Sequence, residues 1–165
     1  MITDLERIKQ LGEEREKENF DFRSWLKMQD PKKIDKTVHR LNQNYSSKID
    51  CTTCGNCCAV IRPLVTNKDI KRITRHLNVS EDVFKQEYTE MDDDGDRQFK
   101  NLPCKFLENK RCSIYTYRPF ECRSYPYLHK KDFISRLFGV IDNYSICPIV
   151  FNVYEDLKLQ LGFKI

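Results

Sequence analysis

The chain has 165 residues, of which 39% are hydrophobic and 33% are charged, a balance typical of a folded domain rather than a disordered one. No stretch approaches the roughly 18 consecutive apolar residues that a membrane span requires. The first residues also lack the apolar run of a signal peptide. We therefore expect a cytoplasmic protein, in a compartment where thiols stay reduced.

The formal net charge is +4, from 29 Lys and Arg against 25 Asp and Glu, and it counts every thiol as neutral. Metal coordination deprotonates cysteine, so eight thiolates around two centres of charge +2 would bring the net charge to about zero. The basic excess is therefore weak evidence for a nucleic-acid partner. We expect a protein partner, with no membrane and no nucleic acid, and the sequence leaves the oligomeric state open.

The first 47 residues contain no cysteine and predict a helical arm. Apolar residues first recur at a helical interval at Ile2, Leu5, Ile8 and Leu11. A second helix is expected to begin at Asp30-Pro31, because aspartate is a good N-cap and proline suits the first helical position. Its apolar positions are Ile34, Val38, Leu41 and Tyr45. Between the two helices lies an aromatic group that we assign to packing: Phe20, Phe22, Trp25 and Leu26.

The rest of the chain alternates short helices with turn signals. Helices are predicted after a cap at Thr66 or Asn67, after a cap at Ser80, and from Pro148 to Leu161. Asp94-Gly95 predicts a turn between short strands, and a second hairpin is expected within 104–114. The fold class is therefore α+β, a mainly helical small domain with one or two short hairpins organised around cysteine metal sites. We expect a helical arm at 1–47 and a cysteine-cluster metal-binding domain at 48–165.

Eight cysteines dominate the chemistry, and in a reducing compartment clustered cysteines more often bind metal than form disulfides. The first block reads Cys51-x2-Cys54-x2-Cys57-Cys58, and four single cysteines follow at Cys104, Cys112, Cys122 and Cys147. A two-residue gap lets two sulfurs reach one metal, and Gly55 suits the turn because glycine accepts a positive φ. Three thiolates at this spacing can hold three corners of a 4Fe-4S cubane, and Cys147-Pro148 has the local form of the closing cysteine. Zinc suits the same loop.

Adjacent side chains project in different directions, so we expect Cys57 and Cys58 to serve different sites or to bridge one polynuclear site. Eight ligands divide naturally into two groups of four. One group would contain Cys51, Cys54, Cys57 and one distal cysteine, and the other group would contain the remainder.

Three distal motifs make the pattern specific. They are Pro103-Cys104-Lys105-Phe106-Leu107, Cys112-Ser113-Ile114-Tyr115 and Arg118-Pro119-Phe120-Glu121-Cys122-Arg123. Together with the first block they resemble the CxxCxxCC family of zinc- or iron-chelating cysteine-cluster proteins, over roughly residues 48–150. The resemblance implies metal binding, by an iron–sulfur cluster or zinc. It implies no reaction, because the family is named for its cysteines, and our first hypothesis for the role is metal or cluster handling or electron transfer.

Two other functions stay open from the sequence. A similar cysteine pattern occurs in flagellin lysine-N-methylases, which use an iron–sulfur cluster and S-adenosylmethionine, so an enzyme that modifies a protein side chain is one alternative. Those enzymes are considerably longer, and this chain has no G-x-G-x-x-G nucleotide loop. A binding module with structural zinc is the other alternative.

The remaining candidates are charged or aromatic side chains near the cysteines. Arg118 and Arg123 flank Cys122 and are candidates for binding the cofactor, because their charge would offset that of the thiolates. Ordinary salt bridges or helix capping would explain the same arginines. Four tyrosines are assigned to a shell that excludes water, with a small pocket as the alternative: Tyr115, Tyr117, Tyr125 and Tyr127. Surface roles rather than ligation are expected for His39, His76 and His129.

Overall fold

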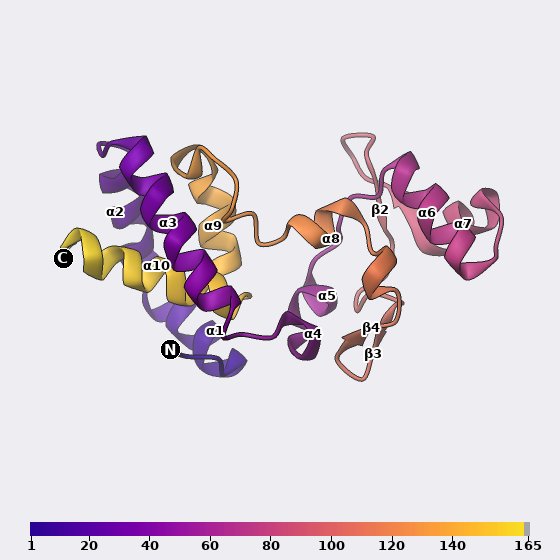
Figure 1. The fold of residues 1–165 in the computed structure, drawn as a ribbon, viewed down its shortest axis with the longest axis horizontal. Coiled ribbons are helices and arrows are strands. Elements are labelled where there is room, and N and C mark those ends of the chain that lie inside the picture. The colour runs from indigo at the N-terminus through magenta and orange to yellow at the C-terminus, as the bar shows by residue number, and fades with distance from the viewer. Residues whose placement is uncertain (164–165) are drawn as a thin grey trace. The chain divides into compact units, whose positions relative to one another are not determined.

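The computed structural model describes residues 1–163, and it confirms a mainly helical α+β fold with two short antiparallel hairpins (Figure 1). The chain forms two compact units. Unit 1 contains residues 1–50 and the chain from residue 126 onward, and unit 2 contains residues 51–125. The expected division into a 1–47 arm and a 48–165 metal-binding domain stays a prediction. No helix within residues 1–163 is long and apolar enough to cross a membrane.

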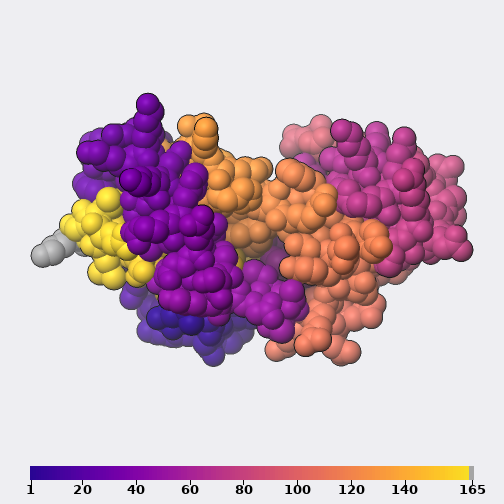
Figure 2. Space-filling model, in the orientation of Figure 1, coloured from indigo at the N-terminus to yellow at the C-terminus, as the bar shows by residue number. Residues whose placement is uncertain are grey.

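Unit 1 is helical throughout and joins the two ends of the chain. Its helices are α1 (Leu5–Glu14), α2 (Glu16–Leu26), α3 (Pro31–Ser46), the 3-10 helix η2 (Phe133–Arg136), α9 (Leu137–Tyr144) and α10 (Pro148–Leu161). Helix α10 packs against α1, α3 and α9. In Figure 2 the indigo and purple N-terminal helices lie beside the yellow C-terminal helix on the surface of this unit. The C-terminal segment therefore completes the core that the N-terminal helices begin.

The local signals of unit 1 explain where its helices begin. The carboxylate of Asp30 accepts a hydrogen bond from the backbone N–H of Lys32, and Pro31 occupies the first helical position of α3. The four apolar positions predicted for this helix are all buried, which confirms the interpretation: Ile34, Val38, Leu41 and Tyr45. Helix α10 begins at Pro148, as predicted.

The predicted aromatic group lies on α2, a helix that its irregular apolar spacing did not predict. The Phe22 ring meets the Tyr154 ring of α10 edge to face, with 5.1 Å between their centroids. Phe22 and Leu26 are buried, whereas Phe20 is 38% exposed. Packing is therefore the main role of this group.

Unit 2 is built from short elements around a separate core. They are α4 (Cys51–Cys54), α5 (Asn56–Val60), α6 (Asn67–Leu77), α7 (Glu81–Tyr88), β1 (Thr89–Met91), β2 (Arg97–Phe99), β3 (Leu107–Glu108), β4 (Arg111–Cys112), the 3-10 helix η1 (Tyr115–Tyr117) and α8 (Phe120–Ser124). Strands β1 and β2 pair on either side of the predicted turn, and β3 pairs with β4 within the second predicted hairpin. The caps predicted at Thr66 and Ser80 are both present.

The core of unit 2 supports the cysteines directly. Its buried members are Val65, Ile70, Ile73, Phe84, Phe99, Phe106 and Ile114. Cys104 and Cys112 pack against this cluster as partly buried side chains. Two candidate metal ligands therefore rest on a hydrophobic core rather than on a mobile loop.

Shortening the side chain of Val38 should destabilise the protein. Val38 is fully buried on α3, so Val38→Ala removes apolar contacts and leaves a cavity, at an expected cost of about 2 kcal/mol in the free energy of unfolding. Urea unfolding followed by circular dichroism measures this loss. Lys36→Ala, an exposed position on the same helix, is the matched control and should change the free energy by less than about 0.5 kcal/mol. Equal losses of unfolding free energy in the two variants would contradict the assignment of Val38 to the buried face of α3.

Candidate metal centre

Seven of the eight cysteines lie in unit 2, on four separate pieces of chain. Helices α4 and α5 carry Cys51, Cys54, Cys57 and Cys58; the other three are Cys104, Cys112 on β4 and Cys122 on α8. Cys51 is exposed, and the remaining six are partly buried. Cys147 is buried in unit 1, where it immediately precedes α10.

The first cysteine block is a helix–turn–helix whose turn is Gly55. The residue has a φ of +66°, as the sequence predicted, so a side chain there would be strained. A Cβ atom at this position would also lie 2.8 Å from the carbonyl oxygen of Lys110 in the β3–β4 turn. The backbone N–H of Cys104 donates to the carbonyl of Cys58 at 2.8 Å. The first block is thus attached to the segment that carries the next cysteine.

Helix α6 holds the segment that leads to Cys122. The Asp69 carboxylate is 2% exposed and accepts a hydrogen bond from the backbone N–H of Phe120, at 3.0 Å, at the start of α8. The Arg72 guanidinium donates to the carbonyl oxygens of Tyr117 and Arg118 and pairs with Asp69 at 2.6 Å. These contacts fix residues 117–120, so they position both Arg118 and Cys122.

The charge of Cys58 raises the pKa of three thiols that lie on other segments. The pKa of Cys122 is raised to about 12, mainly by burial and then by the nearby sulfurs of Cys58, Cys104 and Cys112. Burial likewise raises the pKa of Cys104 to about 11, and Cys58 and Cys112 add to that shift. The pKa of Cys112 is raised by burial and by Cys58, whereas Arg118 lowers it. Burying several thiols together disfavours their ionisation, and a bound cation would reverse that preference.

Cys58 differs from the other three thiols of this set. Its pKa is lowered to about 7, first because the Cys57 side chain forms a hydrogen bond with it, and also because Arg118 is near, although burial opposes the change. A thiolate is the form of cysteine that binds metal. Cys58 is therefore the group in this set that ionises most readily.

The sulfurs of Cys57 and Cys58 lie 4.0 Å apart. We expected adjacent side chains to point apart, and this expectation was wrong: consecutive residues of a helix do not face each other, but the side-chain conformations of these two residues of α5 bring their sulfurs together. Two thiolates on one tetrahedral zinc ion lie about 3.8 Å apart, given Zn–S bonds of about 2.3 Å. The observed separation suits ligation of one metal, or of neighbouring metals in one polynuclear centre.

The donor set fits a thiophilic metal, although the ligand geometry is not closed. Within residues 1–163, no group of three or more His, Cys, Asp or Glu side chains is placed so that it could hold a metal ion. The chemistry of the donors is nevertheless consistent: sulfur ligands select zinc, copper(I) or iron–sulfur clusters over magnesium or calcium. Gathering the four thiols into a closed site would require movements of side chains on a framework that is already connected.

The two candidate arginines differ in how close they lie to the cysteines. Arg118 is close enough to lower the pKa of three cysteines, and its guanidinium lies 3.7 Å from the centre of the Tyr115 ring. Arg123 is exposed on α8 and does not contribute to any of those shifts. Cofactor binding by Arg118 and Arg123 stays a prediction, and only Arg118 gains support from its position.

Among the other predicted residues, Tyr115 and Tyr117 are 40% and 37% exposed, so they do not form a closed shell. His39 contacts the carbonyl of Lys130 in unit 1, and His76 stacks on Tyr117 in unit 2. Ligation by Cys147 stays a prediction. Its backbone N–H donates to the carbonyl of Asn143, which fixes the start of α10.

Asp69 and Arg72 are the supporting residues that the sequence analysis missed. Their signal was present in the spacing of Thr66 and Asp69, because a Thr-x-x-acid pattern marks a capping box. That pattern predicts the start of a helix, and it contains no information about the additional bond from Asp69 to Phe120, 51 residues away.

Comparison with known proteins supports the assignment of a metal-binding domain. A family model named CxxCxxCC, described as "Putative zinc- or iron-chelating domain", matches residues 50–138, which is more than half of the chain. An uncharacterized protein of Methanocaldococcus jannaschii is 35% identical over 81 residues, which cover 47% of this chain and 43% of that protein. The chain therefore spans less than half the length of this relative. No solved structure matched the chain.

Replacing Gly55 with alanine should disturb the cysteine block. Gly55→Ala adds a side chain at positive φ and against the Lys110 carbonyl, so we expect a loss of about 1–3 kcal/mol in the free energy of unfolding, with reduced metal content. Gly139→Ala is the matched control, because this helical glycine has open space around it. The substitution should leave the free energy of unfolding unchanged or raise it slightly. Thermal unfolding and metal analysis of both variants check this. Unchanged stability of Gly55→Ala would contradict the close packing described here.

Removing the charge of Asp69 should loosen the segment that carries Cys122. Burial raises the pKa of Asp69, but hydrogen bonds from Thr66 and Arg72 outweigh it, so the pKa is lowered in the folded state. The stabilisation is therefore present above the unfolded pKa of about 4 and is lost as the pH falls through the folded value. Asp69→Asn should cost about 1–3 kcal/mol at pH 7, as measured by urea unfolding. The difference from the parent should shrink at pH 3.

The exposed substitution Asp93→Asn controls for the general loss of a negative charge, and it should leave the free energy of unfolding nearly unchanged. An Asp69→Asn effect that is the same at pH 3 and pH 7 would contradict an electrostatic role for this carboxylate.

Proposed function

Because the chain belongs to the CxxCxxCC family of zinc- or iron-chelating domains, we propose that it binds zinc or an iron–sulfur cluster through the cysteine thiolates of unit 2. The observation that carries the proposal is the placement of seven cysteines, from four separate pieces of chain, within unit 2, where the Cys104 backbone donates to the Cys58 carbonyl and the Cys57 and Cys58 sulfurs lie 4.0 Å apart. Chance burial of one cysteine is common. Seven cysteines gathered in one compact unit are the arrangement expected of a chelating domain.

The ligands of the proposed centre form two sets. Cys58, Cys104, Cys112 and Cys122 make up the first set. Cys51, Cys54 and Cys57 make up the second. The short distance between Cys57 and Cys58 favours a junction between the sets, so that one polynuclear centre is a stronger alternative than two independent sites. The hydrogen bond from Cys104 to the Cys58 carbonyl would hold this junction in place.

The surrounding residues supply the conditions that a thiolate centre needs. When bound, zinc would hold the thiolates in a redox-inert site, whereas an iron–sulfur cluster would allow transfer of one electron. Arg118 offsets part of the negative charge, and the core residues below Cys104 and Cys112 exclude water from one side. Asp69 and Arg72 keep the Cys122 segment in position.

Metal or cluster handling, or electron transfer, is the role that the exposure of the site favours. Cys51 is exposed and its neighbours are only partly buried, so a centre held by these residues would be accessible to a partner. A centre at the surface can exchange metal or electrons with a partner. We propose a protein partner for this step, in the reducing cytoplasm where the thiols remain available. Exposed apolar side chains in unit 2 would suit such a contact: Val60, Leu102 and Phe120.

Protein purified without oxygen should contain zinc, or iron with labile sulfide, in amounts comparable to the protein. Elemental analysis and the visible absorption spectrum distinguish the two, because iron–sulfur clusters absorb near 400 nm whereas zinc thiolates are colourless. Cys58→Ser should lower the metal content strongly, because it removes a ligand that adjoins both sets. Comparison with Cys54→Ser shows whether the two sets of cysteines are coupled. If they share one centre, either variant should lose all of the bound metal. If they form independent sites, each variant should lose about half of the bound metal.

Ala59→Ser is the matched control, since it adds a hydroxyl group beside the same cysteines in α5 without removing a thiol. This variant should keep its metal. Metal content near zero in well-folded parent protein, or full metal content in Cys58→Ser, would overturn the proposal.

A further inference from the structure

A second candidate site lies on the outer face of α6. Residues 68, 71, 72, 75 and 76 recur at intervals of three and four, so they occupy one side of the helix, whereas Ile70 and Ile73 face the core. The first group is Lys68, Lys71, Arg72, Arg75 and His76. Helix α6 therefore presents a line of four permanent cations over about 10 Å of its axis.

The cations on this face have different tasks. Arg72 is committed to Asp69 and to the carbonyl oxygens of residues 117 and 118. Lys68, Lys71 and Arg75 are exposed, and within residues 1–163 they have no ion-pair partner. The carboxylate of α6, Asp69, is buried on the inner side and already occupied by Arg72. Three positive charges therefore face solvent without compensation.

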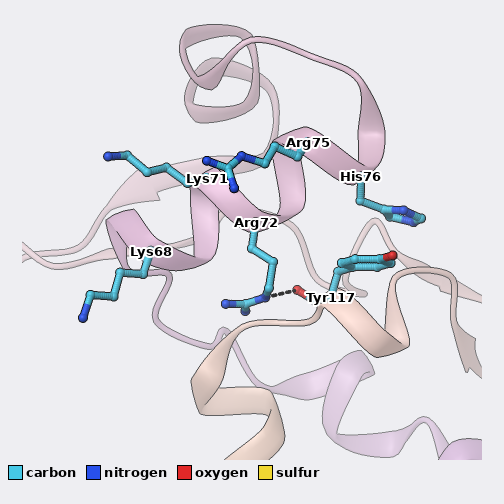
Figure 3. A pocket seen from close by; sticks show the side chains of 6 residues that line it. All are labelled: Lys68, Lys71, Arg72, Arg75, His76 and Tyr117. Carbon is cyan, nitrogen blue, oxygen red and sulfur yellow. Dashed lines mark hydrogen bonds between the residues drawn. The ribbon is translucent and has the colours of Figure 1, made fainter.

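These side chains line a pocket of about 510 Å³ together with Tyr117 (Figure 3). Its floor is aromatic at one end, where the His76 ring stacks on Tyr117 with 3.9 Å between centroids and 14° between planes. Lys68 and Lys71 extend from the helix at the other end (Figure 3). Arg75 is attached beside His76 and directs its guanidinium back toward Lys71, and Arg72 points to the Tyr117 carbonyl (Figure 3). The volume falls in the range of about 300–1,000 Å³ that small-molecule sites occupy.

We propose that this pocket binds a phosphate-bearing small molecule of the nucleotide class. Its phosphates would lie along Lys68, Lys71 and Arg75, and its base would lie against the Tyr117–His76 pair. Lysine and arginine are the side chains that bind phosphate oxygens, through charge-assisted hydrogen bonds. Aromatic rings in the same pocket provide a flat apolar surface that a base can cover.

Other ligands fit this chemistry less well. A metal cation would be repelled by the three uncompensated charges, and a purely apolar ligand would leave them buried without partners. A long single-stranded nucleic acid would use the same groups, but the cations are confined to one helix and one pocket. A compact ligand with clustered phosphates therefore matches the site best. This proposal goes beyond the proposed metal centre and does not depend on it.

Binding can be measured by isothermal titration calorimetry of the full chain with four probes: ATP, tripolyphosphate, inorganic phosphate and a 12-nucleotide oligothymidylate. We expect ATP to bind most tightly, in the micromolar to submillimolar range, and to bind at least about 5-fold more tightly than tripolyphosphate, which lacks the base. Affinity should fall as salt rises, because the contacts are electrostatic. Metal content is measured on the same samples, so failure of this site is distinguishable from failure of the metal centre.

The double variant Lys68→Gln/Arg75→Gln should weaken ATP binding about 10-fold or more, since two charge-assisted contacts are removed. Its matched control is Lys85→Gln/Lys105→Gln, which removes the same charge elsewhere in unit 2 and should keep its affinity within about 2-fold. Circular dichroism confirms that both variants are folded. An equal loss of ATP affinity in both double variants would overturn the proposal, since it would mean that ATP is attracted by the overall positive charge rather than by this pocket.

The aromatic end is tested by Tyr117→Leu against Tyr117→Phe. Loss of the ring should reduce ATP affinity without changing that of tripolyphosphate, and phenylalanine should retain the affinity of the parent. The Arg72 contact survives in both, because it uses the backbone carbonyl of residue 117. No ATP binding at millimolar concentration, equal binding of ATP and tripolyphosphate, or tighter binding of the oligonucleotide than of ATP would each overturn the assignment.

Discussion

The buried carboxylate of Asp69 is the contact on which the arrangement of unit 2 depends. It receives two hydrogen bonds from Thr66, one from Arg72 and one from the backbone of Phe120. An ionised carboxylate is costly to bury alone, and these four donors compensate for that cost while tying α6 to the start of α8. The same interaction therefore caps a helix, fixes the Cys122 segment and sets the position of Arg72. Both candidate sites in this unit, the thiol group and the basic pocket, share that framework.

Sequence patterns predicted the elements whose signals are local. Asp30 and Pro31 marked the start of α3, Thr66 and Ser80 marked α6 and α7, and Pro148 marked α10. Each signal consists of one or two residues that satisfy the backbone at a helix end. The short helices α4, α5 and α8 were not predicted, because four or five residues cannot establish a hydrophobic period. Their form is set by Gly55 and by bonds to distant segments.

For the cysteines too, local sequence patterns identified the residues but not their arrangement in space. Spacing identified them as a metal-binding set, and the family match agrees with that interpretation. Spacing could not reveal that the backbone of Cys104 bonds to that of Cys58, or that Cys104 and Cys112 rest on the core of unit 2, because both depend on packing between distant segments. Nor could it give the 4.0 Å separation of the sulfurs in α5, which depends on the side-chain conformations of Cys57 and Cys58. Long-range packing, rather than motif order, decides which thiols can share a metal.

Net charge was the least informative property of the sequence, and the structure explains why. A total of +4 is small for 165 residues, and metal thiolates would reduce it further. Within unit 2, however, the acids of residues 81–96 and the bases of α6 lie on different elements, and within the described residues none of these acids forms an ion pair with Lys68, Lys71 or Arg75. Screening at physiological salt acts over about 8 Å, which keeps such local fields distinct. The basic face of α6 therefore acts on nearby anions according to its own three uncompensated charges, whatever the charge state of the cysteines.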